Sequence, residues 1–187
     1  TMQTLALVVV AVILALILAI PLGIWAAKSK RFSAIIKPIL DFMQTMPSLA
    51  YLVPVIVLFG IGQVPGAIAT IIFALPPGVR FTELGIRGVD TETVEAGAAF
   101  GASPRHILWR IQMPLAMPTV MAGVNQVIML ALSMVVLSGM VGAGGLGGDV
   151  VAALSQVDIG LGMEAGLAVV IVAVYLDRIC LLYTSPS

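Results

Sequence analysis

Long apolar runs separated by short polar segments make up most of the chain, and they predict membrane-spanning helices. Leu5–Ala27 carries no charged residue and is followed by the basic residues 28–31. A helix needs about 20 mostly apolar residues to cross about 30 Å of hydrocarbon, so this run is long enough for one crossing. Phe42–Val79 is also uncharged but too long for one helix, and the glycines and proline of residues 60–66 predict a turn between two short helices.

A later uncharged run, Ile111–Gly148, predicts a helix that ends near Ser138, because the residues that follow are rich in glycine. A last span ends before Asp177 and Arg178. The pattern therefore predicts an all-α polytopic membrane protein. The alternative is that Phe42–Val79 is a single re-entrant segment, which dips into the membrane and returns to the same side. The five predicted spans are about 5–27, 48–59, 67–79, 114–138 and 161–176.

Composition excludes an ordinary soluble domain. Hydrophobic residues make up 60% of the chain and charged residues 10%, against about 25% charge in soluble domains. The single cysteine excludes a disulfide framework and a thiolate metal cluster, and the single histidine cannot anchor a multi-histidine metal site. We therefore expect no metal site and no catalytic residue.

The basic residues predict the orientation in the membrane. All nine fall after the first, third and fifth predicted spans, whereas the other two connections contain no lysine or arginine. By the positive-inside rule the N-terminus is outside and the C-terminus cytoplasmic. The basic residues are Lys28, Lys30, Arg31, Lys37, Arg80, Arg87, Arg105, Arg110 and Arg178.

The cytoplasmic segment 90–112 carries signals for two short helices. Asp90 can cap a first helix that runs from Thr91 to about Phe100. Gly101 is placed to end that helix in the left-handed conformation. Ser103 and the proline after it then start a second helix, because a proline at the first helical position loses no hydrogen bond.

The first of these helices has the shape of a docking element. Residues 96–99 are alanine and glycine, so a groove wall can approach closely, while Glu95 and Phe100 project. Small residues beside a charge and an aromatic ring are how a helix is seated in a groove. The alternative is a solvated loop with weak helical tendency.

The stretch VEAGAAFGASPRHILWRIQMP, residues 94–114, resembles the coupling signature of bacterial ABC importer permeases. Gly97 stands where that signature has its second alanine, and Met113 where it has leucine; Gly97 should weaken the helix by about 0.5–1 kcal/mol relative to alanine. The resemblance assigns ATPase coupling to Glu95, Ala96, Gly97, Phe100, Gly101, Ile111 and Pro114.

Longer stretches, such as MQTMPSLAYLVPVIVLFGIGQVPG and LALSMVVLSGMVGAGGLG, are similar to permeases of glycine betaine/proline betaine (osmoprotectant) importers, over about residues 5–178. The resemblance implies the type I ABC importer permease fold with a cytoplasmic coupling helix, in a bacterial inner membrane. The implied partners are a cytoplasmic ATPase, a second permease copy, most simply as a homodimer, and an external binding protein, with no nucleic acid. Choline or an amino acid is the alternative solute.

The same resemblance implies that the chain is not an enzyme and binds no cofactor, since ATP and Mg²⁺ are used by the separate ATPase. The sequence agrees, because it contains no G-x-x-x-x-G-K-[ST] loop. A secondary transporter fragment would show inverted repeats around midplane charges, and an intramembrane enzyme would need a nucleophile or metal set within its spans. Neither pattern is present in the sequence.

Two further features leave alternatives open. Asn125, Met129 and Ser133 recur at every fourth position of the fourth predicted span, where they can line a translocation path or join helices. The glycines of residues 142–148 form either a passive external turn or a contact for the binding protein. Residues 179–187 have no counterpart in the family pattern, and we expect a tail that is not native, with no function for Cys180 or Tyr183.

Overall fold

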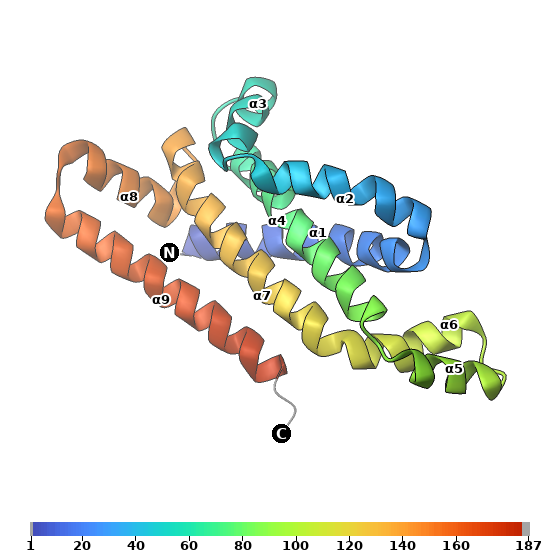
Figure 1. The fold of residues 1–187 in the computed structure, drawn as a ribbon. Helices are drawn as coiled ribbons and strands as arrows, with labels where there is room; N and C mark the ends of the chain where they lie inside the picture. Colours follow the sequence, from blue (N-terminus) through green and yellow to red (C-terminus); the bar gives the residue numbers. More distant parts are fainter. Residues whose placement is uncertain (1, 185–187) are drawn as a thin grey trace.

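The computed structural model describes residues 2–184, with side chains as far as Ile179, and within this part every regular element is a helix (Figure 1). The all-α prediction is confirmed. The elements are α1 Met2–Lys28, α2 Lys30–Thr45, α3 Leu49–Phe59, α4 Gln63–Arg87, α5 Thr91–Ala99, α6 Pro104–Ile107, the π-helical turn η1 Leu108–Gln112, α7 Met113–Ser138, the 3₁₀ turn η2 Gly139–Val141, α8 Gly145–Gln156 and α9 Ile159–Thr184.

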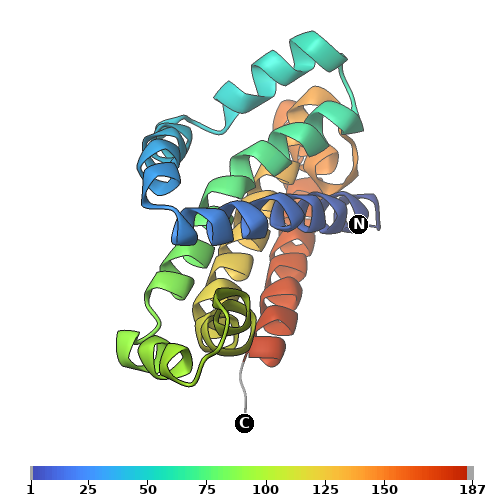
Figure 2. The ribbon, with the colours of Figure 1, turned by 90° about the vertical axis from the view of Figure 1, so that its right-hand side faces the viewer.

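The centre of the molecule is α4, which packs along α1 on one side and α7 on the other (Figures 1 and 2). Small residues allow these helices to approach closely. A Cβ atom on Gly78 would lie 2.7 Å from the Cβ of Ala19, and one on Gly123 would lie 2.4 Å from the Cβ of Phe81. Small residues at helix interfaces are the usual means of close packing in membranes, where lipid offers no hydrophobic drive.

Within residues 2–184, four helical stretches are long and apolar enough to cross a membrane, and a fifth crossing results if the pair α2 and α3, bent by 95°, is one broken span. This differs from the predicted second span, 48–59, which coincides with α3 alone. The sequence prediction misses α2, because the four basic side chains of residues 28–37 favour a hydrated connection. In the structure Ser29 caps α2 by accepting a 3.3 Å hydrogen bond from the amide of Phe32.

The third predicted span, 67–79, was too short. α4 begins at Gln63 and continues to Arg87, so it includes two arginines and one glutamate that lie beyond the predicted span. These charges are compatible with a packed helix because α2 supplies partners of opposite charge to Arg80 and Glu83. α4 therefore continues from the predicted span almost to residue 90, where the coupling segment begins.

The prediction that the glycine-rich residues 139–148 hold no regular helix was wrong for residues 145–148, with which α8, Gly145–Gln156, begins. Tertiary contact explains this helix. The backbones of Gly139 and Gly147 touch, since a Cβ on Gly139 would lie 2.1 Å from the carbonyl carbon of Gly147. The amide of Leu146 also donates a 2.8 Å hydrogen bond to Oγ1 of Thr4, which anchors the start of α8 on α1. Glycine is unfavourable in an isolated helix, but here it allows this backbone contact.

The last helix is longer than the predicted 161–176. α9 continues past Asp177 and Arg178 to Thr184. Asp177 does not interrupt it, because its carboxylate accepts a 2.9 Å hydrogen bond from Nδ2 of Asn125 on α7. Of the predicted tail, residues 179–184 belong to α9, and residues 185–187 lie outside the described part of the chain.

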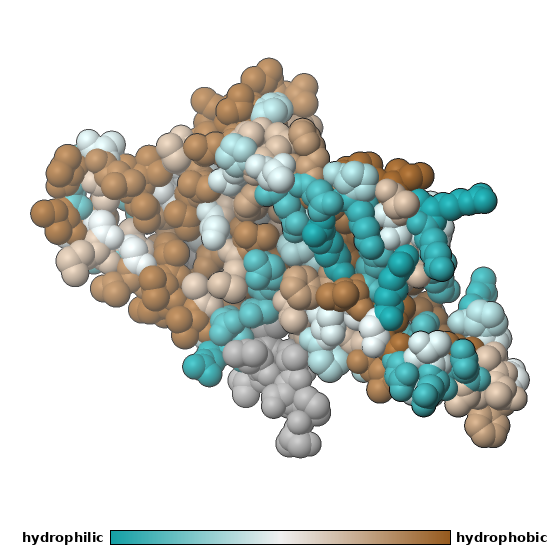
Figure 3. Space-filling view, viewed as in Figure 1, coloured by the Kyte–Doolittle hydropathy of each residue, from teal (hydrophilic) through white to brown (hydrophobic). Residues whose placement is uncertain are grey.

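Polar side chains gather at one end of the molecule. Figure 3 shows hydrophilic residues over α2 and over the α5–α6 hairpin, whereas the α3 tip and the turn between α8 and α9 are hydrophobic. The exposed apolar residues of these two regions include Val57, Leu58, Leu154, Val157 and Ile159. On the face shown, a polar end beside a largely apolar surface is the distribution expected of a membrane protein with one hydrated face.

Candidate functional site

The coupling segment folds as a tight helical hairpin. The carboxylate of Asp90 accepts a 3.2 Å hydrogen bond from the amide of Glu92 and so caps α5. Gly101 has φ +80°, the amide of Gly101 donates to the carbonyl of Ala98, and the amide of Ala102 donates to the carbonyl of Gly97. This pair of bonds is a Schellman motif, which satisfies carbonyls that the helix end leaves free.

The second arm of the hairpin is continuous with α7. Ser103 caps α6 by accepting a 3.4 Å hydrogen bond from the amide of His106, and Pro104 opens the helix. No loop separates the hairpin from the span, since Pro104–Val141 is one helical stretch of 38 residues. The π-helical turn η1 precedes Pro114, which has no N–H to donate to the preceding turn. The residues that lead to Pro114 are therefore helix, and Pro114 itself is exposed.

The tip and the base of the hairpin differ in exposure. Glu95, Ala96 and Gly101 are exposed, and Phe100 at the tip is 93% exposed. At the base, Ile107 and Leu108 are buried, and Leu108 packs with Ile86 and other residues at the ends of α4 and α7. An exposed aromatic ring on a packed base is the arrangement that can insert into a groove of another protein.

Gly97 is a packing position as well as a weak point of the helix. A Cβ atom there would lie 2.5 Å from Cδ1 of Ile111, so α5 rests closely on η1 at this point. Gly97 and Ile111 are both partly buried. The two signature residues therefore meet across the hairpin, although they are far apart along the sequence.

Asn125, Met129 and Ser133, which form the stripe of candidate pathway residues on α7, have different surroundings in the structure. Asn125 is partly buried and joins α7 to α9 through its 2.9 Å hydrogen bond to Asp177. Met129 is 55% exposed, and Ser133 is exposed and donates a 3.0 Å hydrogen bond to the carbonyl of Met129 in its own helix. Asn125 thus connects two helices in this chain, whereas Met129 and Ser133 face its surface.

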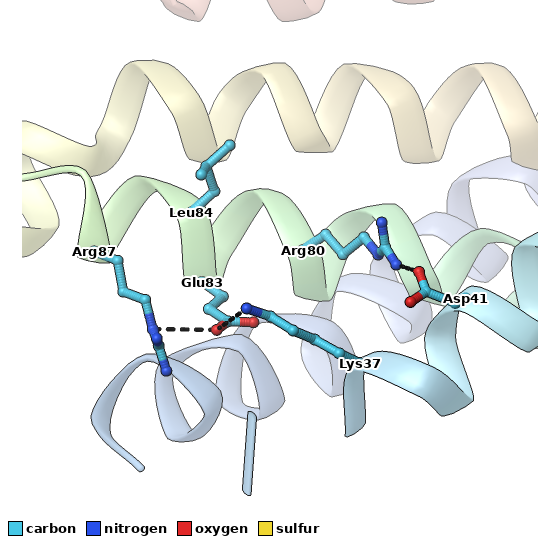
Figure 4. A pocket seen from close by; sticks show the side chains of 6 residues that line it. All are labelled: Lys37, Asp41, Arg80, Glu83, Leu84 and Arg87. Atoms are coloured by element: carbon cyan, nitrogen blue, oxygen red, sulfur yellow. Dashed lines mark ion pairs between the residues drawn. The ribbon is translucent and has the colours of Figure 1, made fainter. Parts of the chain in front are cut away.

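A charged cluster that the sequence reasoning missed joins α2 to α4 (Figure 4). Glu83 is 3% exposed, and its Oε1 accepts a 2.6 Å hydrogen bond from the hydroxyl of Ser33. The same oxygen lies 3.3 Å from Nζ of Lys37 and 3.1 Å from Nε of Arg87. One buried carboxylate therefore has three partners from two helices.

The cluster extends along both helices in opposite directions. Arg80, one turn before Glu83, forms an ion pair with Asp41, one turn after Lys37 (Figure 4). The cluster borders an open pocket of about 410 Å³, which Leu84 also lines. The signal in the sequence is the spacing, because Ser33, Lys37 and Asp41 recur every four residues and so share one face of a helix.

Comparison with known proteins places these features in a family. Residues 19–182 match the model of the family described as binding-protein-dependent transport system inner membrane component. The chain is 56% identical over 177 residues to the glycine betaine/carnitine transport permease protein GbuB of Listeria monocytogenes, covering 95% of this chain and 63% of that protein. It is 54% identical over 178 residues to the glycine betaine/proline betaine transport system permease protein ProW of Escherichia coli, covering 95% of this chain and 50% of that protein.

The chain thus spans only 50–63% of the length of these two relatives. Among solved structures, it superposes on a chain of the MetNI methionine ABC transporter in an inward-facing conformation with a TM-score of 0.85, covering 98% of this chain and 94% of that one. The sequence identity is 22%, so this match carries the fold alone. The match agrees with the predicted type I importer permease fold.

Proposed function

The chain belongs to the family of binding-protein-dependent transport system inner membrane components, and from this premise we propose that it is the permease of an ABC importer that carries a quaternary-amine osmoprotectant inward. The solute we propose is glycine betaine or proline betaine. The substrate class rests on the two betaine permeases that share more than half of its residues over 95% of its length. The observation that carries the coupling role is the exposed hairpin that continues without a break into α7.

The proposed orientation in a bacterial inner membrane has the N-terminus outside and the C-terminus in the cytoplasm. In this orientation α1, α4 and α9 run inward, and the bent pair α2–α3 and α7 run outward. The hairpin and the exposed basic residues of α2 then face the cytoplasm, in keeping with the positive-inside rule.

The proposed partners follow from the exposed parts of the chain. A cytoplasmic ATPase receives the α5–α6 hairpin, with Phe100 as the anchor and Glu95 as the projecting charge. A second permease copy completes the pathway as a homodimer, and an external binding protein delivers the solute. ATP and Mg²⁺ are bound and used by the ATPase, so this chain contributes transport and no catalytic residue.

The proposed coupling step is mechanical. When the two ATPases close on ATP, they move the hairpin, and the continuous helix Pro104–Val141 transmits that movement to α7. A packed helix moves as a rigid element, so a small shift at its cytoplasmic end becomes a tilt at its outer end. The stripe of Met129 and Ser133 would then change its exposure to the pathway.

The test is reconstitution of the full-length permease with its ATPase and binding protein in proteoliposomes. We expect glycine betaine to stimulate ATP hydrolysis and to be taken up, and choline or an amino acid to compete weakly. Replacing Glu95 by Ala or Gly101 by Val should reduce the stimulation at least tenfold, since the first removes the projecting charge and the second strains a left-handed backbone. Full coupling with both residues replaced would refute the role of the hairpin, and uptake of choline or an amino acid in place of betaine would refute the substrate.

A further inference from the structure

The Glu83 carboxylate is the most deeply buried charge in the part of the chain whose side chains the structure describes. Removing a carboxylate from water is strongly unfavourable unless opposite charges and hydrogen bonds replace the lost hydration. Glu83 meets this condition through Ser33, Lys37 and Arg87. Such an arrangement tolerates the loss of a partner poorly, because an uncompensated buried charge would remain.

The partners of Glu83 connect three helices. Ser33 and Lys37 belong to α2, and Arg87 lies one turn further along α4. Arg87 also donates a 2.8 Å hydrogen bond through Nη2 to the carbonyl of Ala26 in the last turn of α1. The last carbonyls of a helix have no partner within it, so this bond fixes the end of α1. The corner between α1 and α2, which contains only Ser29, is thus held on the final turns of α4.

The clamp formed by Glu83 and its partners Ser33, Lys37 and Arg87 lies directly beside the coupling hairpin. α4 ends at Arg87 and α5 begins at Thr91, so only three residues separate the clamp from the hairpin. Movement of the hairpin therefore has two routes into the membrane. One route runs through α6 and η1 into α7. The other runs through α4 to the corner between α1 and α2, which α4 holds.

The second ion pair of the cluster is a weaker element. The side chains of Arg80 and Asp41 are 38% and 59% exposed. Exposed ion pairs contribute little, because water screens them and ordering both side chains opposes their formation. The buried Glu83 group is therefore the stronger of the two charged contacts between α2 and α4.

We propose that Glu83 is a positioning residue that makes the α1–α2 corner and α4 move as one body when the coupling hairpin moves. The proposal rests on the proposed function as an ABC importer permease. It implies that α2 and α3 follow the ATPase cycle through α4, in addition to the direct path through α7.

The first test compares Glu83→Gln with Glu164→Gln in the reconstituted full-length transporter. Glu83→Gln keeps an acceptor for Ser33 but removes the charge, whereas Glu164 is exposed on α9. The measured quantity is the amount of betaine transported per ATP hydrolysed. We expect Glu83→Gln to lower this ratio at least fivefold while binding-protein-stimulated hydrolysis persists, and Glu164→Gln to leave it unchanged. An unchanged ratio in both variants overturns the proposal.

A milder variant covers the case in which Glu83→Gln does not assemble. Lys37→Met removes one partner and leaves Glu83 with Ser33 and Arg87. We expect a smaller fall of the ratio, about twofold, with normal co-purification of the ATPase. A normal ratio in Lys37→Met would contradict the proposal.

The second test replaces the clamp by a covalent link. Ser33→Cys and Glu83→Cys are combined in a Cys180→Ser background and joined by a short bifunctional methanethiosulfonate reagent, whose length substitutes for the glutamate side chain. We expect the double variant to be uncoupled before the reaction and to regain at least half of the wild-type ratio after it. If the link instead abolishes transport, α2 and α4 separate in each cycle and the proposal fails.

Failure of the proposed function would look different. In that case the wild-type chain itself would show neither binding-protein-stimulated hydrolysis nor betaine uptake, and the comparison of variants would not be reached. A wild type that transports betaine with variants that keep its ratio refutes only the role of Glu83.

Discussion

A Cβ atom on Gly97 would lie 2.5 Å from Cδ1 of Ile111, so the first helix of the coupling hairpin rests on the π-helical turn at this pair. The neighbour is the terminal methyl group of a flexible side chain. It can turn aside for one added carbon atom but not for a branched side chain. The residue at position 97 therefore controls how closely the two arms of the hairpin pack.

We expect Gly97→Ala to keep binding-protein-stimulated ATP hydrolysis within twofold of wild type. Replacing glycine by alanine stabilises the helix by about 0.5–1 kcal/mol. Displacement of the Ile111 methyl group is unfavourable and opposes this gain. Gly97→Leu should reduce stimulation at least tenfold, because it separates α5 from η1. The control is Ile111→Val, which removes Cδ1, so adding Gly97→Ala to it should have no unfavourable effect. Wild-type stimulation in Gly97→Leu would contradict the packing role.

Replacing Phe100 should separate stability from partner binding. Since the ring is 93% exposed, Phe100→Ala should change the free energy of unfolding by less than about 0.5 kcal/mol. If the ring is the anchor in the ATPase groove, affinity for the ATPase should fall about tenfold or more, as for central interface residues. Thermal unfolding and co-purification measure the two quantities. Met163→Ala, at a residue of α9 that is 63% exposed, is the control and should retain the ATPase.

The hydrogen bond between Asn125 and Asp177 predicts a loss of stability in Asn125→Ala. The substitution leaves the partly buried carboxylate of Asp177 without this donor, at a cost of about 0.6–2 kcal/mol. Adding Asp177→Leu should recover most of the loss, because replacing both partners by apolar groups can be nearly neutral. Thermal unfolding in detergent is the measurement. A wild-type midpoint in Asn125→Ala would show that the bond joining α7 to α9 contributes nothing to stability.

Ser133→Ala serves as the matched variant on the same face of α7. Its hydroxyl bonds only the carbonyl of Met129 in its own helix among the described residues, so we expect no measurable change in unfolding. A change in transport kinetics at unchanged stability is the expected sign that this part of the stripe lines the pathway. Unchanged kinetics would assign Ser133 to the surface alone.

The contact between Gly139 and Gly147 predicts that Gly139→Ala displaces α8. Backbone atoms cannot turn aside as a side chain can, and overpacking of this kind costs about 1–3 kcal/mol. Gly148→Ala is the control, since a Cβ there meets nothing within 4 Å. Hydrogen exchange of residues 145–156 should rise in the first variant and stay unchanged in the second. Equal exchange in both would show that α8 does not depend on this contact.

The features that the sequence determined by itself are those with local causes. Apolar runs predict spans because hydrocarbon excludes charges, and the runs in α1 and α7 need no knowledge of their neighbours. Asp90, Gly101 and Ser103 specified the hairpin, since a cap bonds backbone groups within a few residues of itself. The proposed function was indicated at the same level, by the resemblance of this segment to the coupling signature of ABC importer permeases.

Only the tertiary structure decided the elements whose causes are distant. α2 and the last turns of α4 carry charges, which by themselves favour a hydrated connection. These charges are accommodated in helices because each helix supplies partners of opposite charge to the other, as Lys37 does for Glu83. α8 contains glycines that disfavour a helix until the backbone of Gly139 packs against them. Ion pairing and close packing depend on residues far apart in the chain, so their free energy appears only when the helices meet.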